Sequence, residues 1–274
     1  MTPWDFEIGI ASHPGRKRSG KPNQDAVEII LPDVERKHPP LLILADGMGG
    51  YAGGEVASRL VIETIRDLYR QSEVSNDYSA FFVGCLQKAH EALRSHSAQN
   101  PQMADMGSTV VLALLDEEQI VTANVGDSRA YLFHDGEILQ LSHDHSVVAE
   151  QVRTGLITPL QARRHPKRNR LTQSLSARRQ EIHPYVNRSL LKPGDIVLLC
   201  SDGLWGVVSE AIIQAVAIEL SPQDAANKLV TLANASQGPD NVSVIIARRA
   251  GDRDESKIAS FLDDTNPGEV LALV

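Results

Sequence analysis

Hydrophobic residues in this chain fall into short runs that have the length of buried β-strands. The runs are rich in Val, Ile and Leu and are bounded by Gly, Asp or Ser, which is typical of strands. The predicted strands cover residues 26–31, 41–45, 109–115, 120–125, 130–133, 138–141, 196–200 and 242–247. Polar linkers at 116–118 and 134–136 join neighbouring runs as hairpin turns would, so antiparallel pairing is expected.

Longer segments with apolar residues at helical spacing separate groups of these strands. The predicted helices cover residues 54–69, 78–97, 147–154, 210–219 and 222–235. Ser221 directly before Pro222 is a favourable cap and first turn for the last helix. Because strands in hairpins stand apart from helix pairs, the pattern favours an α+β layered fold over βαβ winding.

The composition is that of a globular protein with a sizeable core: 274 residues, of which 42% are hydrophobic. We expect one domain over residues 1–250 and a polar, acidic tail of unknown role over 251–274. Residues 1–10 lack an apolar signal core, and no stretch reaches the roughly 18 apolar residues of a membrane helix. Cys85 and Cys200 make no disulfide framework, so the cytoplasm is the expected compartment.

The net charge of -8 changes the range of ligands to consider. Proteins that grip nucleic acid usually carry a basic balance or a basic face, so nucleic acid is not expected as the main ligand. An excess of carboxylates is compatible with divalent cations but does not by itself indicate them.

Aspartates stand at the ends of several predicted strands. Asp46 and Asp202 each follow a strongly apolar run and precede a glycine, Asp127 follows another run, and Asp240 precedes the last. Mg²⁺ and Mn²⁺ prefer oxygen ligands, and a carboxylate next to a rigid strand can supply them. Asp-Gly is also a common turn dipeptide, and a single one is more often a turn than a metal ligand. Spacing alone therefore leaves both interpretations open.

An ordered set of short motifs resembles the type 2C family of metal-dependent serine/threonine protein phosphatases in its compact bacterial form. The set covers roughly residues 5–248, and its order is far more specific than any single block. The blocks are Asn23-Gln24-Asp25-Ala26, Asp46-Gly47-Met48-Gly49-Gly50 with Gly54-Glu55, Met106-Gly107-Ser108-Thr109, Val125-Gly126-Asp127-Ser128-Arg129, Asp144-His145-Ser146, Leu171-Thr172-Gln173-Ser174-Leu175, Cys200-Ser201-Asp202-Gly203-Leu204 and Asp240-Asn241-Val242.

The resemblance implies a four-layer α-β-β-α sandwich of two antiparallel sheets flanked by helix pairs. It also implies hydrolysis of phosphoserine or phosphothreonine on proteins by a hydroxide bridging two divalent cations, Mn²⁺ or Mg²⁺. Phosphoproteins modified by a cognate kinase would then be the partners, and a monomer is expected.

Individual roles follow from the same resemblance. Asp46 would bridge the two cations, and the Gly47 carbonyl would bind one of them. Asp202 and Asp240 would complete the direct ligands, while Asp25 would hold metal-bound waters. Asp127 would help to bind a third, weaker cation.

The phosphate-binding arginine departs from the family pattern. Family members normally have two residues between this arginine and the asparagine, whereas Arg18 and Asn23 are separated by four. Arg18 can reach the phosphate if the loop bulges, and Lys21 is the alternative. An arginine can bind two phosphate oxygens at once, whereas a lysine acts as a point charge.

Tyr51 is the second departure. Many bacterial members have histidine at this position, where it is a proposed general acid for the leaving oxygen. A phenol, with an ordinary pKa near 10, is a weaker acid than imidazolium but still donates a hydrogen bond. The competing hypothesis is therefore a catalytically weak phosphoprotein-binding module that keeps the metal ligands.

Other motifs yield to simpler interpretations. Residues 15–21 match most of a Walker A loop, but Pro22 stands where that motif requires Ser or Thr. His143 and His145 lack further zinc ligands at suitable spacing, so exposed imidazoles in a loop are expected.

A basic stretch between residues 163 and 179 falls in the part of the chain, about 144–185, where the family carries a flap. It either recognises acidic flanks of a phosphopeptide or is a solvated loop, and these two interpretations remain open.

Overall fold

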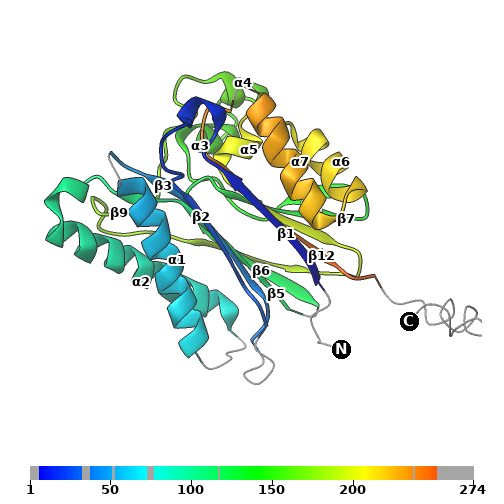
Figure 1. Ribbon diagram of the computed structural model, residues 1–274, viewed down its shortest axis with the longest axis horizontal. Coiled ribbons are helices and arrows are strands. Elements are labelled where there is room, and N and C mark those ends of the chain that lie inside the picture. Colours follow the sequence, from blue (N-terminus) through cyan, green and yellow to red (C-terminus); the bar gives the residue numbers. More distant parts are fainter. Residues whose placement is uncertain are drawn as a thin grey trace, which may run out of the picture.

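Two antiparallel β-sheets pack face to face in the computed structural model, which describes residues 6–32, 38–50, 53–72, 77–116, 118–236 and 238–251 (Figure 1). The smaller sheet has five strands in the order β1-β12-β11-β7-β8. These strands are β1 (Phe6–His13), β12 (Val242–Arg249), β11 (Ile196–Cys200), β7 (Arg129–His134) and β8 (Glu137–Gln140).

The larger sheet has seven strands in the order β10-β6-β5-β3-β4-β9, with β2 paired to β3. Its members are β10 (Tyr185–Leu190), β6 (Gln119–Val125), β5 (Val110–Leu115), β3 (Leu41–Met48), β4 (Gly107–Ser108), β9 (Leu175–Ser176) and β2 (Asp25–Ile30). The polypeptide crosses between the sheets from β6 to β7, and Asp127 lies at that crossing.

Helices cover the outer face of each sheet (Figure 1). Helices α1 (Gly53–Gln71) and α2 (Tyr78–Gln99) pack on the larger sheet, and α6 (Glu210–Glu219) and α7 (Pro222–Ala235) pack on the smaller one. The expected four-layer α+β sandwich is thereby confirmed. No helix in the described ranges is long and apolar enough to cross a membrane.

Strand side chains are divided between three cores by the two-residue period of a strand. Leu41 and Ile43 of β3 point to the helices α1 and α2, whereas Leu42 and Leu44 point to the other sheet. All four are fully buried. Because both faces of the sheet are covered, the central strands appear in the sequence as unbroken apolar runs rather than as alternating ones.

Every predicted strand and helix is present, three of them (β11, α6 and α7) with the predicted ends and the others with shifted ends, and the main omissions are the outer strands β1 and β10. Strand β10 is half-exposed along its length, which hides it among polar residues. Gly9 interrupts the apolar pattern of β1, and a Cβ there would lie 2.2 Å from the Pro222 carbonyl carbon. The close approach of α7 to β1 therefore requires glycine at this position.

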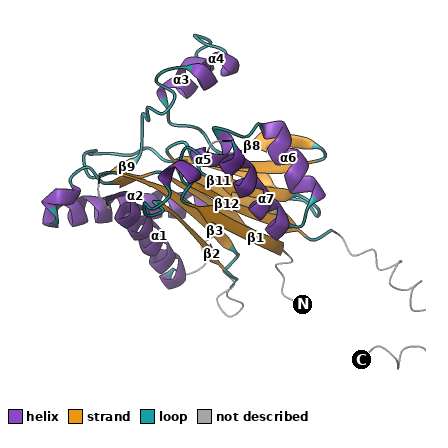
Figure 2. Cartoon of the chain, turned by 45° about the horizontal axis from the view of Figure 1, so that its top comes forward, coloured by secondary structure: helices purple, strands orange, loops and turns teal. Residues whose placement is uncertain are grey.

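The segment between β8 and β9 leaves the sandwich and carries two short helices, α3 (Val147–Arg153) and α4 (Pro159–Arg164). Figure 2 shows both lying apart from the layers. Three further short elements are η1 (Arg16–Arg18), η2 (Pro101–Met103) and α5 (Asp202–Trp205). The predicted tail lies, from residue 252 on, outside the described residues.

Truncation of a side chain between the sheets should weaken the whole fold. Leu42→Ala removes a fully buried side chain from the inter-sheet core and should lower the free energy of unfolding by about 2–5 kcal/mol. Leu190→Ala, at a side chain that is 73% exposed, should change it by less than about 0.5 kcal/mol. Urea unfolding of both variants measures the difference, and equal losses would contradict this assignment of the core.

Candidate metal and phosphate site

Two aspartates face each other across the first strand pair of the larger sheet. Asp25 begins β2 and is the register partner of Asp46 in β3. Asp46 was expected in a turn after the strand, but β3 continues to Met48, so the carboxylate is fixed by strand pairing. The Ser201 hydroxyl, from the other sheet, donates to Asp25 Oδ2 at 2.8 Å. The two sheets therefore meet at this carboxylate.

The smaller sheet supplies two more carboxylates at the same end of the sandwich. Asp202 opens α5 directly after β11, and Asp240 precedes β12. Asn241 ties this end to the larger sheet, because its side-chain oxygen accepts from the Gln24 amide at 3.0 Å. Asp127 lies at the crossing between the sheets.

Mutual repulsion and burial dominate the electrostatics of this cluster. Burial, followed by the charges of Asp25 and Asp202, holds the pKa of Asp46 well above its ordinary value. The pKa of Asp202 is also raised well above its ordinary value, by burial and then by Asp127 and Asp240. A set of carboxylates that repel one another so strongly is stable in the ionised form only next to a cation.

Two milder shifts complete the pattern. Burial is the largest cause that raises the pKa of Asp25 to about 6, against hydrogen bonds from Ser243 and Ser201 that lower it. Burial and then the charge of Asp144 raise the pKa of Asp127 to about 7.

The donor set fits divalent cations. Asp25 Oδ1 and Asp202 Oδ1 are buried and accept no hydrogen bond from the described residues. Buried polar atoms normally have a partner, so these two oxygens indicate a ligand that the protein itself does not provide. The carboxylates are not a ready-made coordination shell, because no group of three or more such side chains in the described ranges has metal-site geometry.

Arg18 holds one of these carboxylates away from a metal-site geometry. Its guanidinium is ion-paired with Asp240 and hydrogen-bonded to the Gln24 side chain. It extends from η1, and the loop bulges around glycines of positive φ, Gly15 at 81° and Gly20 at 83°. Lys21 is exposed. The structure therefore brings Arg18 to the carboxylates despite the longer spacing.

Two glycines next to Asp46 allow strand β3 and helix α1 to pack closely against each other. A Cβ on Gly47 would lie 1.9 Å from the Gly54 carbonyl oxygen, and a Cβ on Gly54 would lie 2.8 Å from the Gly47 carbonyl oxygen. Strand β3 and helix α1 can approach this closely only without these side chains.

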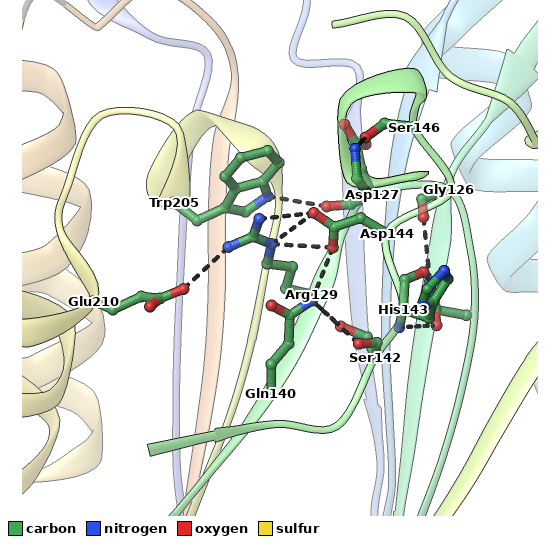
Figure 3. A network of polar contacts seen from close by, with 12 residues as sticks. Gly126, Asp127, Arg129, Gln140, Ser142, His143, Asp144, Ser146, Trp205 and Glu210 are labelled. Atoms are coloured by element: carbon green, nitrogen blue, oxygen red, sulfur yellow. Dashed lines mark hydrogen bonds and ion pairs between the residues drawn. The ribbon is translucent and has the colours of Figure 1, made fainter. Parts of the chain in front are cut away.

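A largely buried arginine that the sequence did not single out, Arg129, lies beside Asp127 (Figure 3). Arg129 Nε donates to both Asp144 oxygens at 3.1 Å, and Nη2 donates to Oδ2 at 2.7 Å. Its Nη1 donates to Glu210 at 3.2 Å, and the guanidinium lies 3.8 Å from the ring centre of Trp205. One arginine thus pairs with two carboxylates, offsets one of their two charges and stacks on an indole.

Trp205 links this arginine to the carboxylate cluster. Its Nε1–H donates to the Asp127 backbone carbonyl at 2.9 Å, and it ends the same short helix that Asp202 begins. The indole therefore fixes the distance between two of the aspartates. Arg129 and Asp144 stand in the motif blocks, but only the fold shows that they are paired.

His145 corrects one prediction, because it is buried rather than exposed in a loop. Its Nδ1 accepts from the Gly126 amide at 3.1 Å, and burial lowers its pKa to about 4. The ring is a neutral hydrogen-bond acceptor that holds the loop before Asp127. Tyr51 lies outside the described residues.

The two packed antiparallel sheets place this chain in the class of α+β sandwich proteins, here with carboxylates gathered at one end of the sandwich. A family model described as "Protein phosphatase 2C" matches residues 14–234. The chain belongs to the protein phosphatase 2C family, and the resemblance drawn from its motifs is confirmed.

Several bacterial proteins are similar to it. Serine/threonine protein phosphatase PstP of Mycobacterium tuberculosis is 38% identical over 208 residues, which are 76% of this chain and 40% of PstP. Thus the chain matches less than half the length of that relative. The crystal structure of the serine/threonine phosphatase Stp1 from Staphylococcus aureus has a TM-score of 0.83 at 32% identity and covers 90% of this chain and 96% of its own. The catalytic domain of PstP, solved with two manganese ions, has a TM-score of 0.78 at 32% identity and covers 89% and 98%.

The raised pKa values predict an unusual pH dependence of stability in the presence of a chelator. Folded Asp25 and Asp127, with pKa values of about 6 and about 7, keep protons that unfolded aspartates with a pKa of 3.8 release. The free energy of unfolding should therefore fall as the pH rises from about 4 to about 7. Asp127→Asn should flatten this fall, whereas Asp67→Asn, at an exposed position, should not. Urea titrations with EDTA across this pH range measure both, and an unchanged slope in Asp127→Asn would refute the assignment.

Proposed function

We propose that this protein hydrolyses phosphoserine and phosphothreonine on proteins with the help of two divalent cations. The observation that carries the proposal is the cluster of mutually repelling carboxylates, some buried and some half-buried, with Arg18 at its rim. Cations at the carboxylates and a guanidinium beside them form a complementary environment for a phosphate dianion. The named phosphatases among its relatives, one solved with two manganese ions, support this assignment.

The chemistry that two bound cations would supply is a hydroxide nucleophile that bridges them and neutralisation of charge on the phosphoryl oxygens. Asp46 would be shared between the cations, with the Gly47 carbonyl, Asp202 and Asp240 as further ligands. Asp25, which the Ser201 hydroxyl holds in place, would orient metal-bound water. Asp127 would take part in a third, weaker site.

Arg18 would bind the phosphate of the substrate. Its ion pair with Asp240 places the guanidinium at the rim of the cluster, and binding of cations to Asp240 would free it for phosphate oxygens. Lys21 would contribute only to the general positive field. Tyr51 would donate a hydrogen bond to the leaving oxygen.

The second candidate is a phosphoprotein-binding module of weak activity, which the tyrosine at position 51 favours. A Mn²⁺-dependent assay with p-nitrophenyl phosphate separates the two candidates. Turnover that requires the metal supports the enzyme, and phosphopeptide binding without turnover supports the module. The physiological setting that we propose is a cytoplasmic monomer in signal transduction that acts, with Mn²⁺ or Mg²⁺, on substrates of a cognate kinase.

Loss of the shared carboxylate should abolish activity but not the fold. Asp46→Asn should reduce Mn²⁺-dependent turnover at least about a hundredfold, because it removes a ligand common to both cations. Without metal, the same variant should be as stable as the wild type or more stable, since burial and repulsion no longer act on a charge. Asp67→Asn serves as the matched control. Turnover near the wild-type level in Asp46→Asn would rule out the proposed bridging role.

Arg18 and Lys21 should differ in substrate binding. Arg18→Ala should raise KM for a phosphopeptide about tenfold to a hundredfold, the loss expected for a charge-assisted hydrogen bond of roughly 1.5–3 kcal/mol. Lys21→Ala should have a much smaller effect that shrinks with added salt. Steady-state kinetics at fixed ionic strength decides between them, and the reverse order of effects would transfer the role to the lysine.

A further inference from the structure

A cavity of about 510 Å³ lies between the predicted flap and the carboxylate cluster. Asp127 and Asp202 line one side of it, so the cavity is continuous with the proposed metal site. Helices α3 and α4 line the other side with apolar residues such as Val148 and Ala162. A molecule that fills the cavity therefore reaches from the flap to the reacting phosphate.

Three arginines of the flap segment, Arg153, Arg163 and Arg168, line this cavity. All three are exposed, and none has a carboxylate partner within the described part of the chain. Arg178, in the same stretch, differs because it is ion-paired with Asp105. Three arginines without an ion-pair partner among the described residues thus line the same space, which favours an anion there.

The acidic residues of the cavity do not cancel this preference. Asp144 and Glu210 are both paired with Arg129. Asp127 and Asp202 belong to the cluster that binds cations under the proposed function. Arg129 thus offsets one of the two charges on Asp144 and Glu210, and the three flap arginines outnumber the one negative charge that remains.

We propose that this cavity is a subsite for acidic side chains that flank the phosphorylated residue of the substrate. The proposal rests on the proposed function, because the occupant must be the same chain that presents its phosphate to the cluster. Guanidinium groups bind carboxylates in a bidentate manner, and the apolar side of the cavity accepts the methylene groups of glutamate. In a protein of net charge -8, a local arginine cluster gives specificity that the overall field opposes.

The test compares pairs of phosphoserine peptides that differ only in glutamate or alanine at positions flanking the phosphoserine. The wild-type protein should prefer the glutamate peptides by about threefold to tenfold in kcat/KM, the size expected for exposed charge pairs. Added salt should reduce the preference. The double variant Arg163→Gln/Arg168→Gln should lose it, and p-nitrophenyl phosphate turnover should stay at the wild-type level.

The matched control is Arg164→Gln/Arg170→Gln, which removes the same charge from the same stretch but not from the lining of the cavity. This control should keep the preference. Equal loss in both double variants, or no preference in the wild type, would overturn the subsite. If p-nitrophenyl phosphate is not hydrolysed at all, the proposed function fails. In that case, fluorescence anisotropy of the same labelled peptides measures their Kd for the two double variants. Weaker binding of the glutamate peptides to Arg163→Gln/Arg168→Gln than to Arg164→Gln/Arg170→Gln supports the subsite, and equal Kd values overturn it.

Discussion

Repulsion between aspartates at one end of the sandwich is the constraint on which the rest of the structure depends. Asp25 and Asp46 are strand neighbours in one sheet, and Asp202 and Asp240 adjoin strands of the other, so the repulsion tends to separate the two layers. The apolar core between the sheets resists that separation with fully buried side chains such as Leu44 and Val197. Hydrogen bonds from Ser201 to Asp25 and from Gln24 to Asn241 join the layers next to the charges. The fold thus holds together carboxylates whose mutual repulsion is relieved either by protonation or by a bound cation.

The layered fold follows closely from the sequence because the central strands are buried on both faces. Unbroken apolar runs such as residues 110–115 have one simple explanation in a chain of this length, a strand covered on both sides. The outer strands lack such runs. Strand β10 is half-exposed, and β1 contains Gly9, which packing against α7 requires. The end of β3 was misplaced for a similar reason. Asp46-Gly47 has the composition of a turn, but register with Asp25 and contact with Gly54 hold it as a strand.

The candidate site could be predicted only in part. Asp25, Asp46, Asp127, Asp202 and Asp240 lie in one electrostatic cluster, as the motifs imply, although their roles toward metal stay proposals. Two residues of positive φ around η1 explain how Arg18 reaches Asp240 across a longer loop. The pairing of Arg129 with Asp144 and Glu210 was not predictable, because it joins segments 15 and 81 residues apart. The burial of His145 was not predicted, because the polar sequence His143-Asp144-His145 does not indicate that the His145 ring accepts a hydrogen bond from the Gly126 backbone amide.

Arg129 connects the aspartate cluster with the cavity beneath α3 and α4. Its guanidinium neutralises Asp144, whose charge would otherwise raise the pKa of Asp127 further, and it supports the indole that holds the Asp127 carbonyl. The same ion pairs remove negative charge from the wall of the cavity beneath α3 and α4. This largely buried arginine therefore limits the rise in the pKa of Asp127 and offsets part of the negative charge of the cavity that the flap arginines also line. Under the proposed function, this distribution of charge would let a protein of net charge -8 receive a dianionic phosphate at one end of the sandwich.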